Sequence, residues 1–248
     1  MTNGNQYNDR AKNKPLFSLL SNGEIQSVSI LPDGSNYSFL VSIEDSSGNY
    51  CKAIYKPKAG EKALWDFHTG TLFRREYLTY LVSQALGWPS VPLTVIRDGP
   101  YGEGSIQLFV DAVPGSNYFT LWEDNTDEFR RIALFDCLVN NADRKAGHCI
   151  LGRDGYIWNI DHGLTFHHSA KLRTVIWEFC GQPIPEALLL DLESFIKCLS
   201  SNEILIDQLK KYLSTVEVQA LENRANILLK KPVFPQLSPY INVPWPWI

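Results

Sequence analysis

The sequence predicts an α+β protein with two lobes, the first rich in β-strands and the second mostly helical. Between residues 25 and 57, short runs of β-branched and aromatic residues are separated by turn residues, which is typical of strands. Apolar residues recur at helical spacing at 71–87, and beyond about residue 116 helical patterns dominate. The chain has 248 residues, of which 44% are hydrophobic, so it can bury a sizeable core within one bilobal domain.

The strands of the first lobe are predicted from runs bounded by turn residues. The first two, IQSVSIL and YSFLVSI, flank the turn PDGSN, in which Asp33-Gly34 is typical of a tight hairpin. The third, YCKAIYKP, ends at Pro57, because proline has no N–H to donate to a neighbouring strand. Two more strands, SVPLTVIRD and GSIQLFVDA, follow a helix at 71–87 and are separated by the turn GPYGEG.

The helices of the second lobe are predicted from their first residues. Asp127 is expected to cap EFRRIALFDCLVNN, and Pro185 is a good first-turn residue for PEALLLDLESFIKCL. Asn202 is expected to cap EILIDQLKKYL. Ser214 and Glu217 form a capping box ahead of VQALENRANILLKK.

The chain is expected to have three segments: a flexible tail at 1–15, a strand-rich lobe at 16–112 and a helical lobe at 113–248. Five scattered cysteines without a CxxC pair indicate neither a disulfide framework nor a zinc knuckle. The net charge of -4 argues against a nucleic-acid partner. We find no secretory signal and no run long enough for a transmembrane segment, so a cytoplasmic location is expected.

One segment, NADRKAGHCILGRDGYIWNIDHG, combines residues suited to phosphoryl transfer. Asp143 and His148 are five positions apart, the spacing of a kinase catalytic loop, and Asp161 follows beside glycine, where a kinase holds magnesium. The turn at 153–155 between them predicts a small hairpin. The hairpin would fold the chain back so that both aspartates reach one point, where a divalent cation offsets their repulsion.

The first lobe offers the partners that this chemistry needs. Strand alternation places Ile54 and Lys56 on one face, so the apolar side chain can cover a base while the ammonium group reaches phosphate. Glu76 on the first helix could pair with Lys56 and hold it extended. Ser35 and Asn36, in the first hairpin turn, could present amides and a hydroxyl to phosphate.

Four stretches, AIYKPKAGE, GSIQLFVDA, NADRKAGH and IDHGLTF, together resemble the phosphatidylinositol 3-/4-kinase superfamily. They are most similar to the type II phosphatidylinositol 4-kinase branch and its bacterial relatives. The match covers roughly residues 30 to 165, with the motifs in the same order. The resemblance implies a bilobal protein-kinase-like fold, with ATP and Mg²⁺ as cofactors and Mn²⁺ as an alternative.

The resemblance also implies roles for individual residues. Lys56 would contact the ATP phosphates and Glu76 would be its helix partner. Gln107 to Val110 would form the hinge, with backbone groups of Phe109 and Val110 reading adenine. Asp143 would be the catalytic aspartate and Asp161 the magnesium aspartate.

One departure from the family pattern bears on function. His148 stands where the family usually has asparagine, and imidazole is a softer ligand than an amide oxygen, so the choice of metal is open. We expect an ATP-dependent phosphotransferase acting on a hydroxyl of a lipid headgroup, a protein or a small molecule. The alternatives are a nucleotide-binding pseudokinase and an enzyme that transfers AMP. Arg144 has two interpretations, pairing within the fold or a part in the chemistry.

Overall fold

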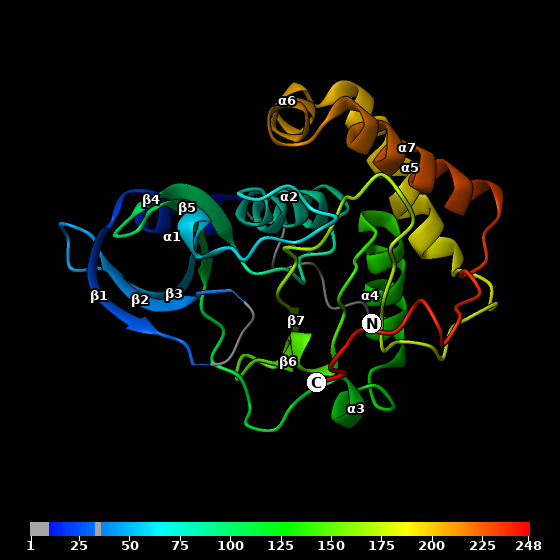
Figure 1. Cartoon of the computed structure of the whole chain (residues 1–248), viewed down its shortest axis with the longest axis horizontal. Helices are drawn as coiled ribbons and strands as arrows, with labels where there is room; N and C mark the ends of the chain where they lie inside the picture. The colour runs from blue at the N-terminus through cyan, green and yellow to red at the C-terminus, as the bar shows by residue number, and fades with distance from the viewer. Residues whose placement is uncertain (1–9, 33–35) are drawn as a thin grey trace.

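The computed structural model describes residues 10–32 and 36–248, and it is an α+β structure as expected. A five-stranded antiparallel sheet forms one end and most helices form the other (Figure 1). The sheet order is β1-β2-β3-β5-β4. The strands are β1 (Glu24–Ile30), β2 (Phe39–Glu44), β3 (Tyr50–Pro57), β4 (Thr94–Gly99) and β5 (Gly102–Leu108).

Each of the five strands overlaps its predicted run, with ends that differ by up to four residues, and the predicted alternation of β3 is confirmed. Ala53 and Tyr55 are fully buried on the core face, whereas Ile54 and Lys56 lie on the opposite face and are partly exposed. Lys56 pairs with Ser105 of β5, so it sits near the end of a central strand. The predicted turn at Asp33-Gly34 lies outside the described residues.

Helix α1 (Arg10–Asn22) corrects the expected tail, because residues 10–15 are helical. The helix is held by Leu19 and Leu20, which are buried in a hydrophobic cluster with Val41 and Ile43 of β2. The sequence does not predict this helix, because the polar residues at 10–15 lack apolar residues at helical spacing and Pro15 disfavours a helix interior.

Helix α2 (Leu72–Ala85) confirms the predicted helix of the first lobe and lies between the sheet and the helices of the second lobe (Figure 1). Its apolar side chains Leu78 and Val82 belong to the hydrophobic core of the helical lobe. Tyr80 packs against both that core and the cluster under the sheet. Helix α2 therefore connects the two lobes by its packing.

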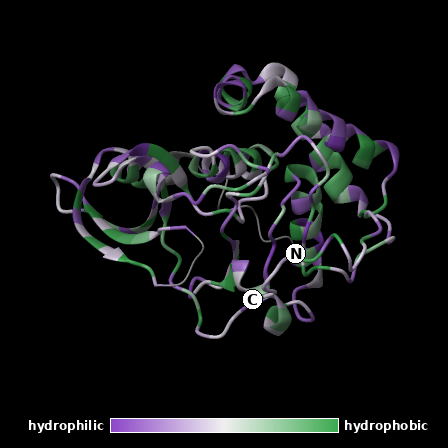
Figure 2. Cartoon of the chain, in the orientation of Figure 1, coloured by the Kyte–Doolittle hydropathy of each residue, from purple (hydrophilic) through white to green (hydrophobic). Residues whose placement is uncertain are grey.

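The helical lobe contains α4 (Thr126–Val139), α5 (Glu186–Ser201), α6 (Glu203–Tyr212) and α7 (Thr215–Lys230). Asn202 caps α6 and the Ser214–Glu217 capping box begins α7, both as predicted. Hydrophobic and hydrophilic residues alternate around these helices, as expected for helices packed on one side (Figure 2).

Two details of this lobe differ from the prediction. Asn125, and not Asp127, occupies the cap position of α4, and Asp127 lies in the first turn, where it pairs with Arg130 at 3.0 Å. A one-turn helix, α3 (Tyr118–Leu121), was not predicted, because its capping box is set by Asn117 and Thr120 without an apolar repeat.

The predicted small hairpin is present as β6 (Cys149–Leu151) and β7 (Ile157–Asn159). Gly155 in its turn has φ 83°, a backbone conformation that glycine adopts without steric cost. The C-terminal segment runs back to this region, where the Ala146 N–H donates to the Trp247 carbonyl at 2.8 Å. Among the described residues, every helix is too short or too polar to cross a bilayer.

Candidate active site

Three charged side chains that were predicted to act together meet at the interface of the lobes. Lys56 of β3 forms an ion pair with Glu76 of α2, and its Nζ also lies 2.9 Å from Oδ1 of Asp161. The second oxygen of Glu76 accepts the His162 N–H at 2.9 Å. Because Asp161 and His162 are adjacent, Glu76 holds both the lysine and the backbone of the loop that carries the aspartate.

The charges of this group stabilise one another. Burial disfavours the ammonium form of Lys56, but Asp161 and Glu76 outweigh it and raise the lysine pKa above its usual value. Lys56 in turn lowers the pKa of Asp161, so this carboxylate is ionised at neutral pH. Burial raises the pKa of Glu76, which Lys56 opposes. The Asp161 side chain is 53% exposed, so its carboxylate is accessible to a ligand.

The loop that carries Asp161 has an unusual backbone. Asp161 has φ 60°, in the left-handed region that non-glycine residues rarely adopt. Such a conformation costs on the order of 1–3 kcal/mol and persists only when surrounding contacts impose it. Here the His162 N–H bond to Glu76 and the Ile160 N–H bond to the His148 carbonyl at 3.0 Å fix both sides of the residue.

Asp143 lies on the loop that follows α4, beside Lys145. Its backbone N–H donates to Asn141 Oδ1 at 3.0 Å, and its Oδ2 lies 3.2 Å from Lys145 Nζ. Burial raises the pKa of Asp143 to about 6, against the opposing effect of Lys145. Asp161 adds to the increase, and Arg173, whose Nη1 donates to the neighbouring Ala142 carbonyl at 3.5 Å, opposes it. An acid with this pKa is suited to accept a proton near neutral pH.

Arg144 serves the fold, which resolves the two interpretations left open by the sequence. It is fully buried and makes a bidentate pair with Asp136 of α4, with Nε–Oδ2 and Nη2–Oδ1 distances of 2.8 and 2.9 Å. Its Nη1 donates to the carbonyls of His148 and Ile160 at 3.2 and 3.3 Å. It also contacts His162 Nε2 at 2.7 Å, so one side chain ties the Asp143 loop to the Asp161 loop.

His148 points at the same carboxylate from the opposite side to Lys56. Its Nε2 lies 3.5 Å from Asp161 Oδ2, and its Nδ1 accepts the Lys145 N–H at 3.4 Å. Burial lowers the pKa of His148 to about 4, so the ring is neutral at pH 7. Because Nδ1 accepts this bond, the neutral ring carries its proton on Nε2, and that N–H faces Asp161 Oδ2. The ionised, half-exposed carboxylate of Asp161 is an oxygen ligand that fits a divalent cation completed by phosphate oxygens. His148 can join it as a ligand in its other tautomer, with the proton on Nδ1 and Nε2 unprotonated.

The other predicted nucleotide contacts divide into two groups. Ser35 lies outside the described residues, and Asn36 uses its side-chain oxygen to accept the Lys62 N–H at 2.8 Å. Gln107 is buried and donates to Thr94 Oγ1 at 2.9 Å, so its side chain supports the sheet.

The predicted hinge offers one backbone donor for a base. The Phe109 N–H is engaged by the Lys52 carbonyl at 3.0 Å, which corrects the expectation that this group reads adenine. Within the part of the chain that is described, the Val110 N–H has no hydrogen-bond partner. Val110 is therefore the hinge residue whose N–H can meet a ligand.

Three residues of this region were not predicted. In the sequence, Asp136 stands at helical spacing from the apolar residues Phe129 and Ile132, and a carboxylate on such a face needs a buried partner, which is the signal for it. Lys145 is only two positions after Asp143, so its proximity to that carboxylate is a local feature of the sequence. Arg173 is near Asp143 only through the fold, because its segment runs beside the Asp143 loop, with a 2.9 Å bond from the Arg173 N–H to the Asn141 carbonyl.

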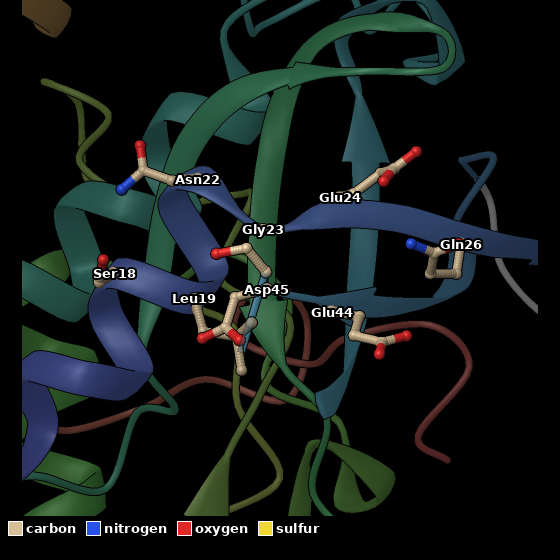
Figure 3. A pocket seen from close by; sticks show the side chains of 9 residues that line it. Ser18, Leu19, Asn22, Gly23, Glu24, Gln26, Glu44 and Asp45 are labelled. Atoms are coloured by element: carbon tan, nitrogen blue, oxygen red, sulfur yellow. The ribbon is translucent and has the colours of Figure 1, made fainter. Parts of the chain in front are cut away.

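A cavity of about 610 Å³ lies apart from these residues, between α1 and the β1–β2 hairpin. Its lining includes the carboxylates of Glu24, Glu44 and Asp45 (Figure 3). Glu24 and Glu44 are direct cross-strand partners, so the cavity carries concentrated negative charge. Such a surface repels phosphate, which excludes it as the site of a nucleotide triphosphate.

Comparison with known proteins identifies one relative by sequence. Protein Rv2133c of Mycobacterium tuberculosis is 37% identical over an alignment of 264 positions, which covers 92% of this chain and 94% of that protein. A scan of the sequence against models of protein families finds no match.

Solved structures with the same fold are kinases. The Golgi casein kinase superposes with a TM-score of 0.57 and 16% identity, over 90% of this chain and 74% of that one. The proinflammatory kinase CtkA of Helicobacter pylori has a TM-score of 0.53 and 12% identity, over 87% and 94%. Fam20 of hydra has a TM-score of 0.54 and 14% identity, over 90% and 89%. The expected kinase-like fold is confirmed at this level of similarity, which concerns the fold alone.

Proposed function

The chain belongs to the family of the mycobacterial protein Rv2133c and has a kinase-like fold, and we propose that it is an ATP- and metal-dependent phosphotransferase. The observation that carries the proposal is the Lys56 ammonium group, paired with Glu76 and 2.9 Å from Asp161. A lysine for phosphate, a helix carboxylate that orients it and a metal-binding aspartate are parts that phosphoryl transfer from ATP requires.

We assign each residue a role that follows from its surroundings. Lys56 neutralises phosphate oxygens, and the Val110 N–H binds the adenine edge while Ile54 covers the base. Asp143 orients the acceptor hydroxyl and accepts its proton, for which its raised pKa is suited. Lys145, 3.2 Å from Asp143, faces the transferred phosphoryl group. We assign residues 16–112 and 113–248 to the two lobes of this single catalytic domain.

Asp161 and His148 are the residues that would hold the metal ion. A divalent cation bound there would bridge the phosphates and offset their negative charge. A Golgi casein kinase structure contains Mn and ADP, which supports a nucleotide and a divalent metal for this fold. Mg²⁺ and Mn²⁺ are both candidates for this chain.

The acceptor is a hydroxyl of a lipid headgroup, a protein or a small molecule. The four sequence motifs that resemble type II phosphatidylinositol 4-kinases support a lipid acceptor. A polyanionic headgroup is less favoured, because the segment at 164–179 contains only two residues that are always cationic, Lys171 and Arg173. Lys171 is already paired with Asp66 at 2.8 Å. A protein or small-molecule hydroxyl is therefore retained beside the lipid.

The test is transfer of labelled γ-phosphate to components of a cell extract by the wild-type protein and by Asp161→Asn. We expect the variant to lose turnover while its circular dichroism spectrum stays that of a folded protein. Asp98→Asn, at an exposed position at the end of β4, is the matched control and should keep full activity. Undiminished transfer by Asp161→Asn would contradict the proposal, and intact mass of the product distinguishes transfer of phosphate from transfer of AMP.

A second function, nucleotide binding without catalysis, is favoured by His148 at the usual asparagine position of the metal site. ATP binding with no turnover across lipid, protein and small-molecule acceptors would support it. Release of ADP over many turnovers that depends on Asp143 would exclude it.

A further inference from the structure

Helix α2 carries two neighbouring charged residues with different partners. Glu76 pairs with Lys56 at the interface of the lobes. Arg75 is buried, and its Nη2 lies 2.6 Å from Oε1 of Glu217 on α7. Its Nη1 donates to the Thr165 carbonyl at 2.5 Å. Arg75 therefore joins the helix that bears Glu76 to two separate parts of the helical lobe.

The carboxylate of Glu217 is fixed independently of α2. Its Oε2 accepts the backbone N–H of Ser214 at 2.9 Å and the Ser214 hydroxyl at 2.8 Å, as part of the capping box of α7. Burial opposes ionisation, but Arg75 and Ser214 outweigh it and lower the pKa of Glu217. Arg75 thus meets an oxygen that α7 already holds in place.

A buried chain of hydrogen bonds links the same helix to the loop of Asp161. The hydroxyls of Thr79 and Thr165 lie 3.1 Å apart, and Thr165 donates to the His162 carbonyl at 2.9 Å. The His162 N–H donates to Glu76 at 2.9 Å. All four side chains are buried. A shift of α2 would therefore disturb the residue next to Asp161.

The apolar side chains of α2 also hold the helix against the helical lobe. Leu78, Val82 and Leu86 pack in the core of the helical lobe, so the helix is held there by burial as well as by charge. Moving α2 outward would expose these side chains and leave the buried Arg75 charge without its partner, which are both unfavourable.

We propose that Arg75 and Glu217 are positioning residues whose ion pair keeps α2 in place, so that Glu76 stays on Lys56 before a nucleotide binds. The site is then assembled without an activating modification or partner. This inference rests on the proposed phosphotransferase function and specifies the regulation of that site.

The test uses Glu217→Gln, because glutamine keeps the capping box but removes the charge that faces Arg75. We expect the amides of α2 to exchange hydrogen faster. We also expect kcat to fall about ten- to a hundredfold, because a displaced Lys56–Glu76 pair misaligns the phosphates. The KM for the acceptor should stay unchanged. In a Glu76→Gln background the same change should have little further effect on kcat, because both act through one group.

Two controls separate positioning from general stability. Glu222→Gln makes the same chemical change on α7, where the carboxylate accepts a hydrogen bond from the Gln219 side chain at 3.3 Å, and should match the wild type. Asn202→Ala removes the side-chain cap of α6, whose oxygen accepts the Leu205 N–H at 3.1 Å, and leaves Arg75, Glu217 and Ser214 unchanged, so it should lower thermal stability and keep kcat.

The proposal is overturned if Glu217→Gln keeps wild-type exchange in α2 and wild-type kcat, or if Asn202→Ala reproduces its loss of kcat. It is also overturned if the wild type gains turnover only after phosphorylation or addition of a partner. A wild-type protein without turnover under any of these conditions would instead contradict the phosphotransferase function. The exchange measurement needs no ATP and would still decide whether the ion pair holds α2.

Discussion

Arg144 and Asp136 form a fully buried, bidentate ion pair across the end of α4, with distances of 2.8 and 2.9 Å. The pair fixes the loop after α4, because Asp143 directly precedes Arg144. Arg144 also donates to the carbonyls of His148 and Ile160, so the same guanidinium sets the separation of the Asp143 loop from the Asp161 loop. Because its donors are used internally, Arg144 is not free to bind an added phosphate group.

Asp136→Asn should destabilise the protein strongly, because it leaves the buried Arg144 charge without a counter-charge. We expect a loss of about 3–5 kcal/mol in the free energy of unfolding, measured by urea denaturation. Asp127→Asn, which breaks only the exposed pair of Asp127 with Arg130 on the same helix, should cost at most about 0.5 kcal/mol. Equal stabilities of the two variants would contradict the structural role of Asp136.

Turnover should decrease at acid pH because Asp143 becomes protonated. With a pKa of about 6, the base form is lost below that pH, and kcat should fall about tenfold per pH unit there. Asp143→Asn should abolish transfer at every pH. A pH profile that stays flat between 5 and 7 would show that Asp143 is not the base.

The same raised pKa makes Asp143 unfavourable for stability at neutral pH. Between about pH 4 and 6 the folded protein keeps a proton on Asp143 that the unfolded chain has lost, so its contribution to stability falls as the pH rises. Asp143→Asn should therefore stabilise the protein at pH 7, by about 1–3 kcal/mol. Thermal denaturation at pH 4 and pH 7 measures this; the gain should disappear at pH 4.

Lys56→Met should remove turnover, because the phosphates lose their cation. It should also destabilise the fold, because the buried carboxylate of Glu76 loses its counter-charge. The loss of stability should be about 3 kcal/mol or more. Lys56→Met with Glu76→Gln should recover much of that stability but none of the turnover. Recovery of turnover in the double variant would contradict a role for Lys56 at the phosphates.

His148→Asn should change the preferred metal ion. Neutral imidazole suits Mn²⁺ better than Mg²⁺, whereas an amide oxygen suits Mg²⁺. We expect the ratio of kcat/KM with Mn²⁺ to that with Mg²⁺ to fall in the variant. His168→Asn, at an exposed position in the segment after Asp161, is the control. An unchanged ratio in His148→Asn would remove His148 from the metal site.

The sequence could predict features that are encoded locally. Strand alternation placed Ile54 and Lys56 on one face, and the caps at Asn202 and Ser214 fixed where α6 and α7 begin. The resemblance of four motifs to one kinase branch named Lys56, Glu76 and Asp161, which the fold brings together. It also named Asp143, which the fold pairs with Lys145.

Contacts between distant segments could not be predicted in this way. Arg75 and Glu217 are separated by 142 positions, and both are compatible with an exposed helical surface when considered alone. Helix α1 depends on Leu19 and Leu20 meeting the sheet, which its polar sequence does not indicate. The Phe109 N–H donates to the Lys52 carbonyl because β5 pairs with β3. The hinge sequence alone does not give the register of that pairing.

The C-terminal segment has a practical consequence for handling the protein. Its contacts reach both sides of the cleft loops, since the Asn242 carbonyl accepts the Thr174 N–H at 3.0 Å and the Trp247 carbonyl accepts the Ala146 N–H. Tyr240, just before them, is 93% exposed and open to a protease of chymotryptic specificity. A single nick there would detach the irregular segment at 241–248, which borders the Asp143 loop, while both lobes stay intact. Such a preparation would migrate almost normally on a gel, and under the proposed function we expect it to lose turnover.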